Sequence, residues 1–189
     1  MFLLVGLGNP GARYAQTRHN AGFLVLQELA RDEGVRFTRL EHGARVARVR
    51  MDDREVMLAK PQTYMNASGK AVAGLVGYYR VPLTNLVVVA DDLDLPLGAL
   101  RLRRSGGSGG HHGLDSIIAA LGTKDFARLR LGLGRPPDDA VDFVLGTPNA
   151  ADNRKFMASV KRAAEALRVF VREGPEAAMN EFNRTPAEA

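Results

Sequence analysis

Residues 85–95 read NLVVVADDLDL, an unbroken apolar run followed directly by acidic residues. The run lacks the alternation of polar and apolar residues that a half-exposed strand shows, so it predicts a strand covered on both faces. Such strands lie inside α/β sheets, whose ligand sites gather at the carboxyl ends of the strands. Asp91 and Asp92 end the predicted strand and therefore mark the expected site of function.

Strand and helix patterns alternate on either side of this segment. Further strands are predicted at 2–7, 99–104, 127–134 and 140–146, together with a hairpin over 44–60 that turns at 52–54 and buries one face. Helices are predicted at 20–34, 66–80, 114–122 and 150–172. Asn66 is the expected N-cap of the second helix, and Thr17 or Asn20 that of the first.

Interleaved strands and helices with one hairpin predict an α/β fold, with a twisted mixed β-sheet flanked by helices. No Pro-rich or Ser-rich break separates two cores, so residues 1–189 are expected to form a single domain. The C-terminal helix is amphipathic, since its apolar residues fall on one stripe: Phe156, Val160, Ala164, Leu167 and Val171.

The composition is that of a folded protein, with 46% hydrophobic and 25% charged residues in a chain of 189. The absence of Cys excludes disulfides and thiolate zinc sites, and it fits a reducing compartment. The sequence holds no run of 18 apolar residues and no signal peptide pattern. These features predict a soluble, cytoplasmic protein with no membrane partner.

The formal net charge of +5 is unevenly distributed along the chain. Residues 97–135 hold seven basic side chains and two acidic ones, a surplus equal to that of the whole chain. A solvated face of scattered charges is one interpretation, and a polyanionic partner is the other. The Gly-rich stretch at 105–113 inside this segment favours a polyanion, because glycines let a backbone approach sugar and phosphate closely.

Two glycine motifs point to nucleotides but lack necessary parts. GLGNPG at 6–11 matches G-x-G-x-x-G, yet the helical pattern begins only near Asn20, so no helix N-terminus follows the third glycine. SGGSGGHHG at 105–113 lacks the G-K-[ST] ending of a P-loop. The adjacent His111 and His112 have no cysteine or H-x-x-x-H spacing that would indicate a metal site.

His19 lies in TRHNAG at 17–22, just before the first helix. The sequence has no G-x-S-x-G nucleophile motif, so water is the better candidate for an attacking group. A histidine oriented by a carboxylate can activate water, and His19 with Asp91 fits that chemistry. An isolated histidine is more often structural, and the residues alone leave both roles open.

Four segments together carry a resemblance to a known family. They are GLGNPGARYAQTRHNAG at 6–22, KPQTYMNASG at 60–69, DDLDLPLGALRLRRSGGSGGHHGLDSI at 91–117 and RLRLGLGRP at 128–136. In order and spacing they resemble the bacterial type of peptidyl-tRNA hydrolase, over residues 3 to about 146. The resemblance implies a monomeric α/β enzyme without metal, cofactor or obligate protein partner. Its partner would be the acceptor end of peptidyl-tRNA, whose ester to the 3′-terminal ribose it would hydrolyse to recycle tRNA from stalled ribosomes.

The resemblance also implies roles for individual residues. His19 matches the catalytic base, Asp91 the carboxylate that orients it, and Asn66 a side chain that stabilises the attacked carbonyl. The positions that match substrate-binding residues are Asn9, Tyr14, Tyr64, Met65, Asn66, His111 and His112. Arg103 and Arg130 match positions where the family places basic residues on tRNA phosphate.

His112 departs from the family pattern, which reads GHNG where this chain reads GHHG. Imidazole does not reproduce the paired donor and acceptor of an amide, so the role of His112 is carried over only in part. The rival from another class is a non-catalytic RNA-binding module on the same fold, which would bind tRNA and release nothing. A dinucleotide-dependent oxidoreductase is the third alternative.

Overall fold

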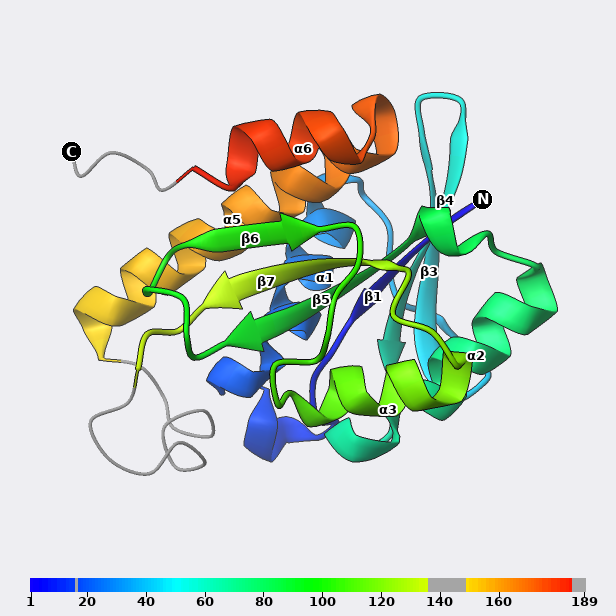
Figure 1. Cartoon of the computed structure of the whole chain (residues 1–189), viewed down its shortest axis with the longest axis horizontal. Coiled ribbons are helices and arrows are strands. Elements are labelled where there is room, and N and C mark those ends of the chain that lie inside the picture. Colours follow the sequence, from blue (N-terminus) through cyan, green and yellow to red (C-terminus); the bar gives the residue numbers. More distant parts are fainter. Residues whose placement is uncertain (16, 136–148, 185–189) are drawn as a thin grey trace.

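The computed structural model describes residues 1–15, 17–135 and 149–184. Within them the strands form one seven-stranded sheet in the order β2-β3-β4-β1-β5-β7-β6 (Figure 1). The strands are β1 (Phe2–Gly6), β2 (Arg39–Glu41), β3 (Ala44–Met51), β4 (Arg54–Pro61), β5 (Leu86–Asp92), β6 (Leu100–Arg103) and β7 (Ala127–Gly132). The predicted strand at 140–146 lies outside the described residues.

The centre of the sheet is parallel and its sides are antiparallel. β1 pairs in parallel with β4 and β5, and β5 pairs in parallel with β7. β2, β3 and β4 form an antiparallel set on one side, and β6 runs antiparallel to β7 on the other. The predicted mixed sheet is therefore confirmed, and the carboxyl ends of four parallel strands meet at one edge.

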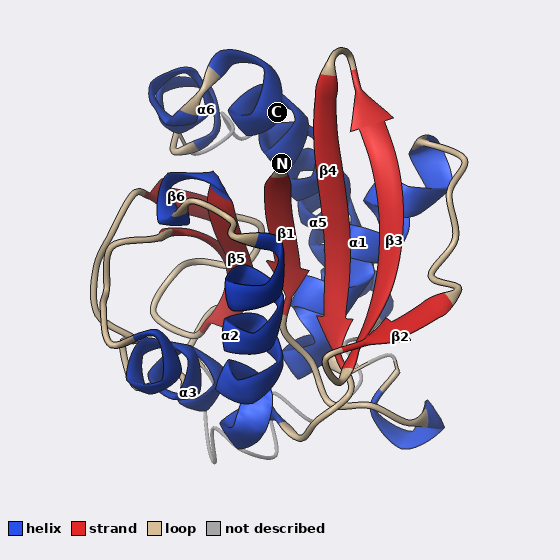
Figure 2. Cartoon of the chain, turned by 90° about the vertical axis from the view of Figure 1, so that its right-hand side faces the viewer, coloured by secondary structure: helices blue, strands red, loops and turns tan. Residues whose placement is uncertain are grey.

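Helices cover both faces of the sheet. Their bounds are α1 (Ala21–Asp32), α2 (Ser68–Tyr79), α3 (His112–Leu121), α5 (Ala150–Glu173) and α6 (Pro175–Phe182). Figure 2 shows α2 and α3 on one face, with α1 and α5 on the other. Alternate strand residues feed the two cores: Leu4 contributes to the core under α1 and α5, whereas Leu3 and Val5 contribute to the core under α2 and α3.

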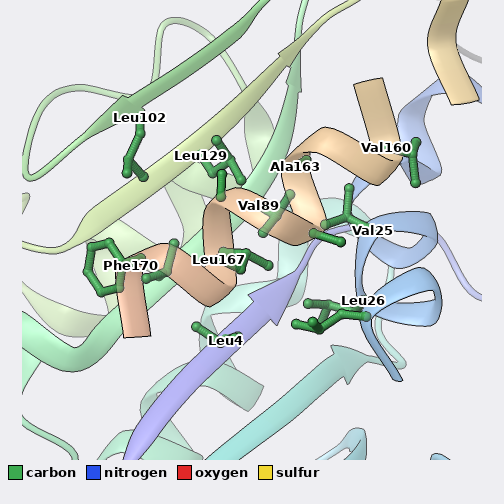
Figure 3. Close-up of a cluster of buried hydrophobic side chains, with 14 of the residues drawn as sticks. Leu4, Val25, Leu26, Val89, Leu102, Leu129, Val160, Ala163, Leu167 and Phe170 are labelled. Atoms are coloured by element: carbon green, nitrogen blue, oxygen red, sulfur yellow. The ribbon is translucent and has the colours of Figure 1, made fainter. Parts of the chain in front are cut away.

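The long C-terminal helix α5 packs through the stripe that its sequence predicted. All five stripe residues are buried. Figure 3 shows Leu167 and Ala163 among side chains of the strands and α1. At the start of α5, the Asn149 side chain accepts the backbone N–H of Asp152 at 2.9 Å. The short helix α6, which the sequence analysis did not predict, follows and lies against β6 (Figure 1).

Two local predictions were wrong. β4 does not have one buried face, because it pairs with β1 as well as β3 and is buried at every residue from Val56 to Pro61. Asn66 is not the N-cap of the second helix, because a short 3-10 helix, η3 (Met65–Ala67), precedes α2 and puts Ala67 at the cap position. Both differences arise from tertiary packing rather than local propensity.

A contact between two glycines fixes how α1 meets the sheet. A Cβ atom on Gly22 would lie 2.3 Å from the backbone nitrogen of Leu7, and one on Gly6 would lie 2.2 Å from the carbonyl oxygen of Gly22. Side chains at these positions would push the helix away from β1. The close approach brings the segment just before α1, which holds His19 and Asn20, against the ends of β1 and β5.

Candidate active site

A cavity of about 580 Å³ lies at the carboxyl ends of β1, β4 and β5. The expected site residues that line it are Asn9, His19, Tyr64, Met65, Asn66, Asp91, His111, His112 and Arg130. These residues come from segments more than 100 positions apart, and the parallel strands bring them together. Arg103 lines a neighbouring cavity instead, and Tyr14 lines neither of the two.

Asp91 is the centre of a buried hydrogen-bonded group. Its Oδ1 lies 2.8 Å from Nδ1 of His19 and 2.9 Å from Nε2 of His111. The two rings are neighbours, with centroids 5.1 Å apart and planes tilted by 41°. Because Asp91 is only 5% exposed, this carboxylate is largely removed from water and interacts mainly with the two histidines.

These contacts determine which ring nitrogens carry hydrogen. An ionised carboxylate only accepts hydrogen bonds, so Nδ1 of His19 and Nε2 of His111 are the donors. Nδ1 of His111 accepts the backbone N–H groups of Gly113 and Leu114 at 3.1 and 3.4 Å, and thereby caps α3. When the one hydrogen of a neutral imidazole is on Nδ1, the His19 ring offers Nε2 as an acceptor, and no other described residue bonds to Nε2.

The ionised state of Asp91 follows from its partners. Burial by itself raises the pKa of this carboxyl group, because it penalises the charged form. The interactions with His111 and then with His19 outweigh burial and hold the pKa of Asp91 well below its usual range. The site therefore keeps a fixed negative charge beside His19 across the physiological pH range.

Asn9 also lines the cavity, and three hydrogen bonds hold it in place. Its backbone N–H donates to Oδ1 of Asn20 at 2.7 Å, and its carbonyl accepts from Nδ2 of Asn20 at 3.0 Å. Its own Oδ1 accepts the backbone N–H of Met65 at 2.8 Å, which ties the end of β1 to the segment after β4. Because Oδ1 is occupied, the Nδ2 group of Asn9 is the part left to donate to a bound molecule.

The segment after β4 supplies an exposed side of the cavity. Tyr64 is 68% exposed and Asn66 is also exposed, whereas Met65 is buried beneath them. The amide of Asn66 forms no hydrogen bond with the residues that the structure describes. Its donor and acceptor groups are therefore open to a ligand in the cavity.

A buried arginine, Arg128, anchors the Gly-rich loop at residues 105–113. Arg128 is 1% exposed, and its guanidinium donates to the carbonyls of Gly106, Gly107, Lys124 and Phe126. Arg130 also donates to the Gly107 carbonyl, at 2.8 Å, and pairs with Asp92 at 3.3 Å. Arginines of the basic segment thus order the loop that borders the cavity.

The basic segment is less positive at its surface than its sequence indicates. Arg128 is buried, while Arg104 pairs with Glu176 and Arg135 with Asp94. Arg103 is exposed and lines the cavity of about 390 Å³ that adjoins the first one through Arg130. Arg103 is therefore a cation of this segment that is exposed beside the active-site cavity and open to a polyanion.

The roles of two residues around the cavity were not predicted from the sequence. Asn20 was predicted as a possible helix cap, but its side chain makes no capping bond and holds Asn9 instead. Arg128 was counted among the seven basic side chains of residues 97–135, with no buried role predicted for it. A buried arginine and a surface arginine give the same pattern in an alternating strand, so the sequence alone does not distinguish them.

Tyr14 lies in a short 3-10 helix, η1 (Ala12–Tyr14), where Arg13 packs over its ring.

Among the described residues, His19, Asp91 and His111 also form the one group whose potential metal-ligand atoms lie within 4.8 Å of each other. The separations of 2.8 and 2.9 Å from Asp91 are hydrogen-bond distances. Metal binding through Nε2 of His111 would move the hydrogen of the neutral ring to Nδ1, and the ring would then lose its capping bonds to Gly113 and Leu114. The donor set therefore fits a hydrogen-bonded dyad with a supporting histidine better than a metal centre.

A mixed α/β sheet with a histidine–aspartate pair and open amide groups around a cleft at its strand ends is an arrangement of groups that suits a hydrolase with an α/β fold. The family model described as peptidyl-tRNA hydrolase matches residues 3–189. The chain belongs to the peptidyl-tRNA hydrolase family.

Similar proteins support this membership over nearly the whole chain. The chain is 47% identical to a peptidyl-tRNA hydrolase of Desulforamulus reducens, covering 97% of this chain and 89% of the relative. It is 50% identical to that of Nocardia farcinica, covering 96% and 95%. A crystal structure of peptidyl-tRNA hydrolase from Acinetobacter baumannii matches with a TM-score of 0.91 and 34% identity, over 97% of this chain and 94% of that one. The described helices include none with the length and apolar character needed to cross a membrane.

Proposed function

We propose that this chain hydrolyses the ester between a peptide, or an N-blocked amino acid, and the 3′-terminal ribose of tRNA. It would thereby recycle peptidyl-tRNA released from stalled ribosomes, acting in the cytoplasm as a monomer on the acceptor end of its substrate. Membership of the peptidyl-tRNA hydrolase family supports the reaction. The observation that carries the mechanism is the bond from Nδ1 of His19 to Asp91, which leaves Nε2 as a base beside the cavity.

In the proposed mechanism, Nε2 of His19 takes a proton from water while the water oxygen attacks the ester carbonyl. Asp91 orients the ring and stabilises the imidazolium that forms. The tetrahedral intermediate then breaks its bond to the ribose 3′ oxygen, which receives the proton from His19. The products are a peptide with a free carboxyl group and a tRNA with a free 3′ hydroxyl.

Asn66 and Asn9 supply the uncharged donors that this reaction needs. The open amide of Asn66 is suited to donate to the carbonyl oxygen as negative charge develops there. Nδ2 of Asn9, left free by the bonds to Asn20 and Met65, is suited to donate to a peptide carbonyl of the substrate. Tyr64 and Met65 would form a wall for the 3′ end or the peptide, with Tyr14 farther out.

His111 takes a more internal role than direct substrate binding. Both of its ring nitrogens are engaged, one with Asp91 and one with the start of α3. We assign it the positioning of Asp91, while the exposed His112 next to it faces the substrate space. Arg103 and Arg130 would bind tRNA phosphates, with Arg103 contributing more because Arg130 is already paired with Asp92.

The decisive experiment measures release of N-acetyl-amino acid from N-acetyl-aminoacyl-tRNA in EDTA. Wild-type protein should release it rapidly, and His19→Ala should lose at least ~10²-fold in kcat while still binding tRNA. Binding of tRNA without release by the wild-type protein would instead identify the non-catalytic RNA-binding alternative. An unchanged rate in His19→Ala would refute the assignment of the base.

A further inference from the structure

Two cations face each other on the far side of the sheet from the basic segment. Arg45 on β3 and Lys60 on β4 are direct partners in the antiparallel register. Like charges in this arrangement repel and weaken the strand pair. Across the described residues, no carboxylate forms an ion pair with either of them. Within the described part of the chain, this cation pair therefore has no anionic partner.

Lys60 makes this arrangement costly because it is only 8% exposed. Its Nζ lies 4.2 Å from the centroid of the Phe37 ring and 5.6 Å from that of Phe23. The rings offset part of the cost of burying an ammonium group. Burial, with a smaller contribution from Arg45, lowers the pKa of Lys60 to about 8, so at neutral pH the group is still mostly charged.

The pair borders a groove made of two cavities that share Lys60. One, of about 190 Å³, is also lined by Arg45, Gln62 and Asn9; the other, of about 480 Å³, extends to Arg36. Within the described structure, neither cavity is lined by a carboxylate. The groove therefore presents cationic and amide donors together with aromatic rings, and it repels no anion.

The position of the groove indicates which part of the substrate reaches it. Asn9 lines both the groove and the active-site cavity, so the two are adjacent. Figure 2 shows β3 and β4 on the opposite side of the sheet from β6, which carries Arg103. The substrate has two parts joined at the reacting ester carbon, the tRNA and the peptide, and these are its two arms. If the tRNA arm follows Arg130 and Arg103, the peptide arm leaves across Asn9 toward Lys60.

We propose that this groove binds the peptide arm of the substrate and favours an acidic side chain, whose carboxylate pairs with Lys60 and Arg45. The inference rests on the proposed function. A carboxylate between the two cations would remove their mutual repulsion, and charge-assisted hydrogen bonds are the stronger class. The amides of Gln27 and Gln62 would meet the peptide backbone. Hydrolysis should therefore be faster for peptides with Glu near the ester than for their Gln counterparts.

The test uses tRNA that carries N-acetylated tetrapeptides with one Glu, or one Gln, at the second, third or fourth residue from the ester. Wild-type protein should show a kcat/KM at least about 5-fold higher for Glu than for Gln at one of these positions. Arg45→Gln and Lys60→Met should each reduce that ratio toward one while leaving the rate on the Gln substrates within about 2-fold. Arg50→Gln is the matched control, because Arg50 is exposed on the same strand near its turn and pairs only loosely with Asp53.

Each result separates the two proposals. Hydrolysis of the Gln substrates reports on the proposed function, and the Glu/Gln ratio reports on the groove. A ratio near one at all three positions in the wild-type protein overturns the groove assignment while the function stands. An equal loss on Glu and Gln substrates in Arg45→Gln, with a weaker salt dependence, would assign the cations to tRNA phosphate and also overturn it. If no substrate is hydrolysed, both proposals fail together.

Discussion

Asp91 serves two histidines through one oxygen atom, and the two have different tasks. Both ring nitrogens of His111 are hydrogen-bonded, so this residue connects the end of β5 to the start of α3. Only Nδ1 of His19 is hydrogen-bonded, so Nε2 is left for the proposed reaction. The same carboxylate therefore serves a structural histidine and a reactive one, and what distinguishes the two is the second contact of each ring.

Replacing Asp91 by Asn tests this division. The carboxamide oxygen can still accept hydrogen bonds from both rings, so the shape of the site is kept while its negative charge is lost. We expect kcat to fall by about 10²-fold or more with a much smaller change in KM, measured on N-acetyl-aminoacyl-tRNA. Asp94→Asn is the control, since Asp94 lines the same cavity with a side chain that is 76% exposed. Equal losses in the two variants would contradict the special role of Asp91.

Lys60→Met should increase stability at neutral pH. Because the pKa of Lys60 is about 8 in the folded protein and about 10.5 when unfolded, the unfolded chain binds more protons between these values, and stability rises with pH there. The cost of burying the charge is thus complete below pH 8 and absent above about 10.5. Allowing for the lost contacts with the rings, the variant should gain about 1 kcal/mol at pH 7 and little at pH 10.5 in urea unfolding. Lys70→Met, at an exposed site in α2, should change nothing, and a loss of stability in Lys60→Met at pH 7 would contradict the cost assigned to Lys60.

At the scale of elements, the entry of α1 depends on the absence of a side chain at Gly22. The helix approaches β1 so closely that His19, three residues earlier, reaches Asp91 on the neighbouring strand. A displacement of α1 by less than the width of a methyl group would lengthen the 2.8 Å bond between these residues beyond hydrogen-bond range. Packing of the helix and catalytic geometry are therefore coupled.

Gly22→Ala should reduce both stability and activity. The added Cβ would lie within 2.6 Å of three backbone atoms. Unlike side-chain atoms, these cannot relieve the clash by a change of rotamer. We expect a loss of about 1–3 kcal/mol in urea unfolding, together with a lower kcat. Gly77→Ala is the opposite case in α2, because its Cβ would meet nothing within 4 Å, and it should gain up to about 1 kcal/mol. If Gly77→Ala were less stable than Gly22→Ala, the close contact of Gly22 with the backbone would not be the cause of the loss.

Elements with a continuous sequence pattern were predictable from the sequence, whereas features set by contacts distant in the chain were not. The interior strand β5 and the stripe of α5 were predictable, because each carries a continuous pattern that its burial confirms. The burial of β4 on both faces was not, since it results from pairing with β1, more than 50 residues earlier. The bonds from Asn20 to Asn9 likewise join two loops, and no periodicity records them. The site residues were named through a family resemblance, and their roles remain proposals.

Across the whole molecule, positive charge flanks the active-site cleft on two sides. Arg103 lies on the β6 side, and the Arg45–Lys60 pair lies on the β3 and β4 side. Among the described residues, three acidic side chains line the cleft: Asp91 pairs with His19 and His111, Asp92 with Arg130, and the exposed Asp94 with Arg135. A negatively charged substrate can thus be attracted to both sides without meeting an unpaired carboxylate at any of these three positions.

Salt should weaken substrate binding, and Arg103 should account for part of that effect. Contacts with phosphate release counterions, so KM for N-acetyl-aminoacyl-tRNA should rise as salt increases. Arg103→Ala should raise KM at low salt and reduce the slope of log KM against log salt by about 1, with kcat preserved. Arg50→Ala, which removes the same charge near the hairpin turn, should leave the slope unchanged. A flat salt response of the wild-type protein would argue against phosphate contacts altogether.

The anchoring of the Gly-rich loop by Arg128 has a consequence for the kinetics of association. A stretch with four glycines between residues 105 and 110 would ordinarily sample many conformations, and a ligand would have to select one of them. Here the carbonyls of Gly106 and Gly107 are already held by one buried guanidinium, which also bonds the carbonyls of Lys124 and Phe126, before any ligand arrives. Encounter should therefore be limited by diffusion and orientation rather than by rearrangement of this loop. Loss of that guanidinium would appear as a slow conformational phase preceding binding.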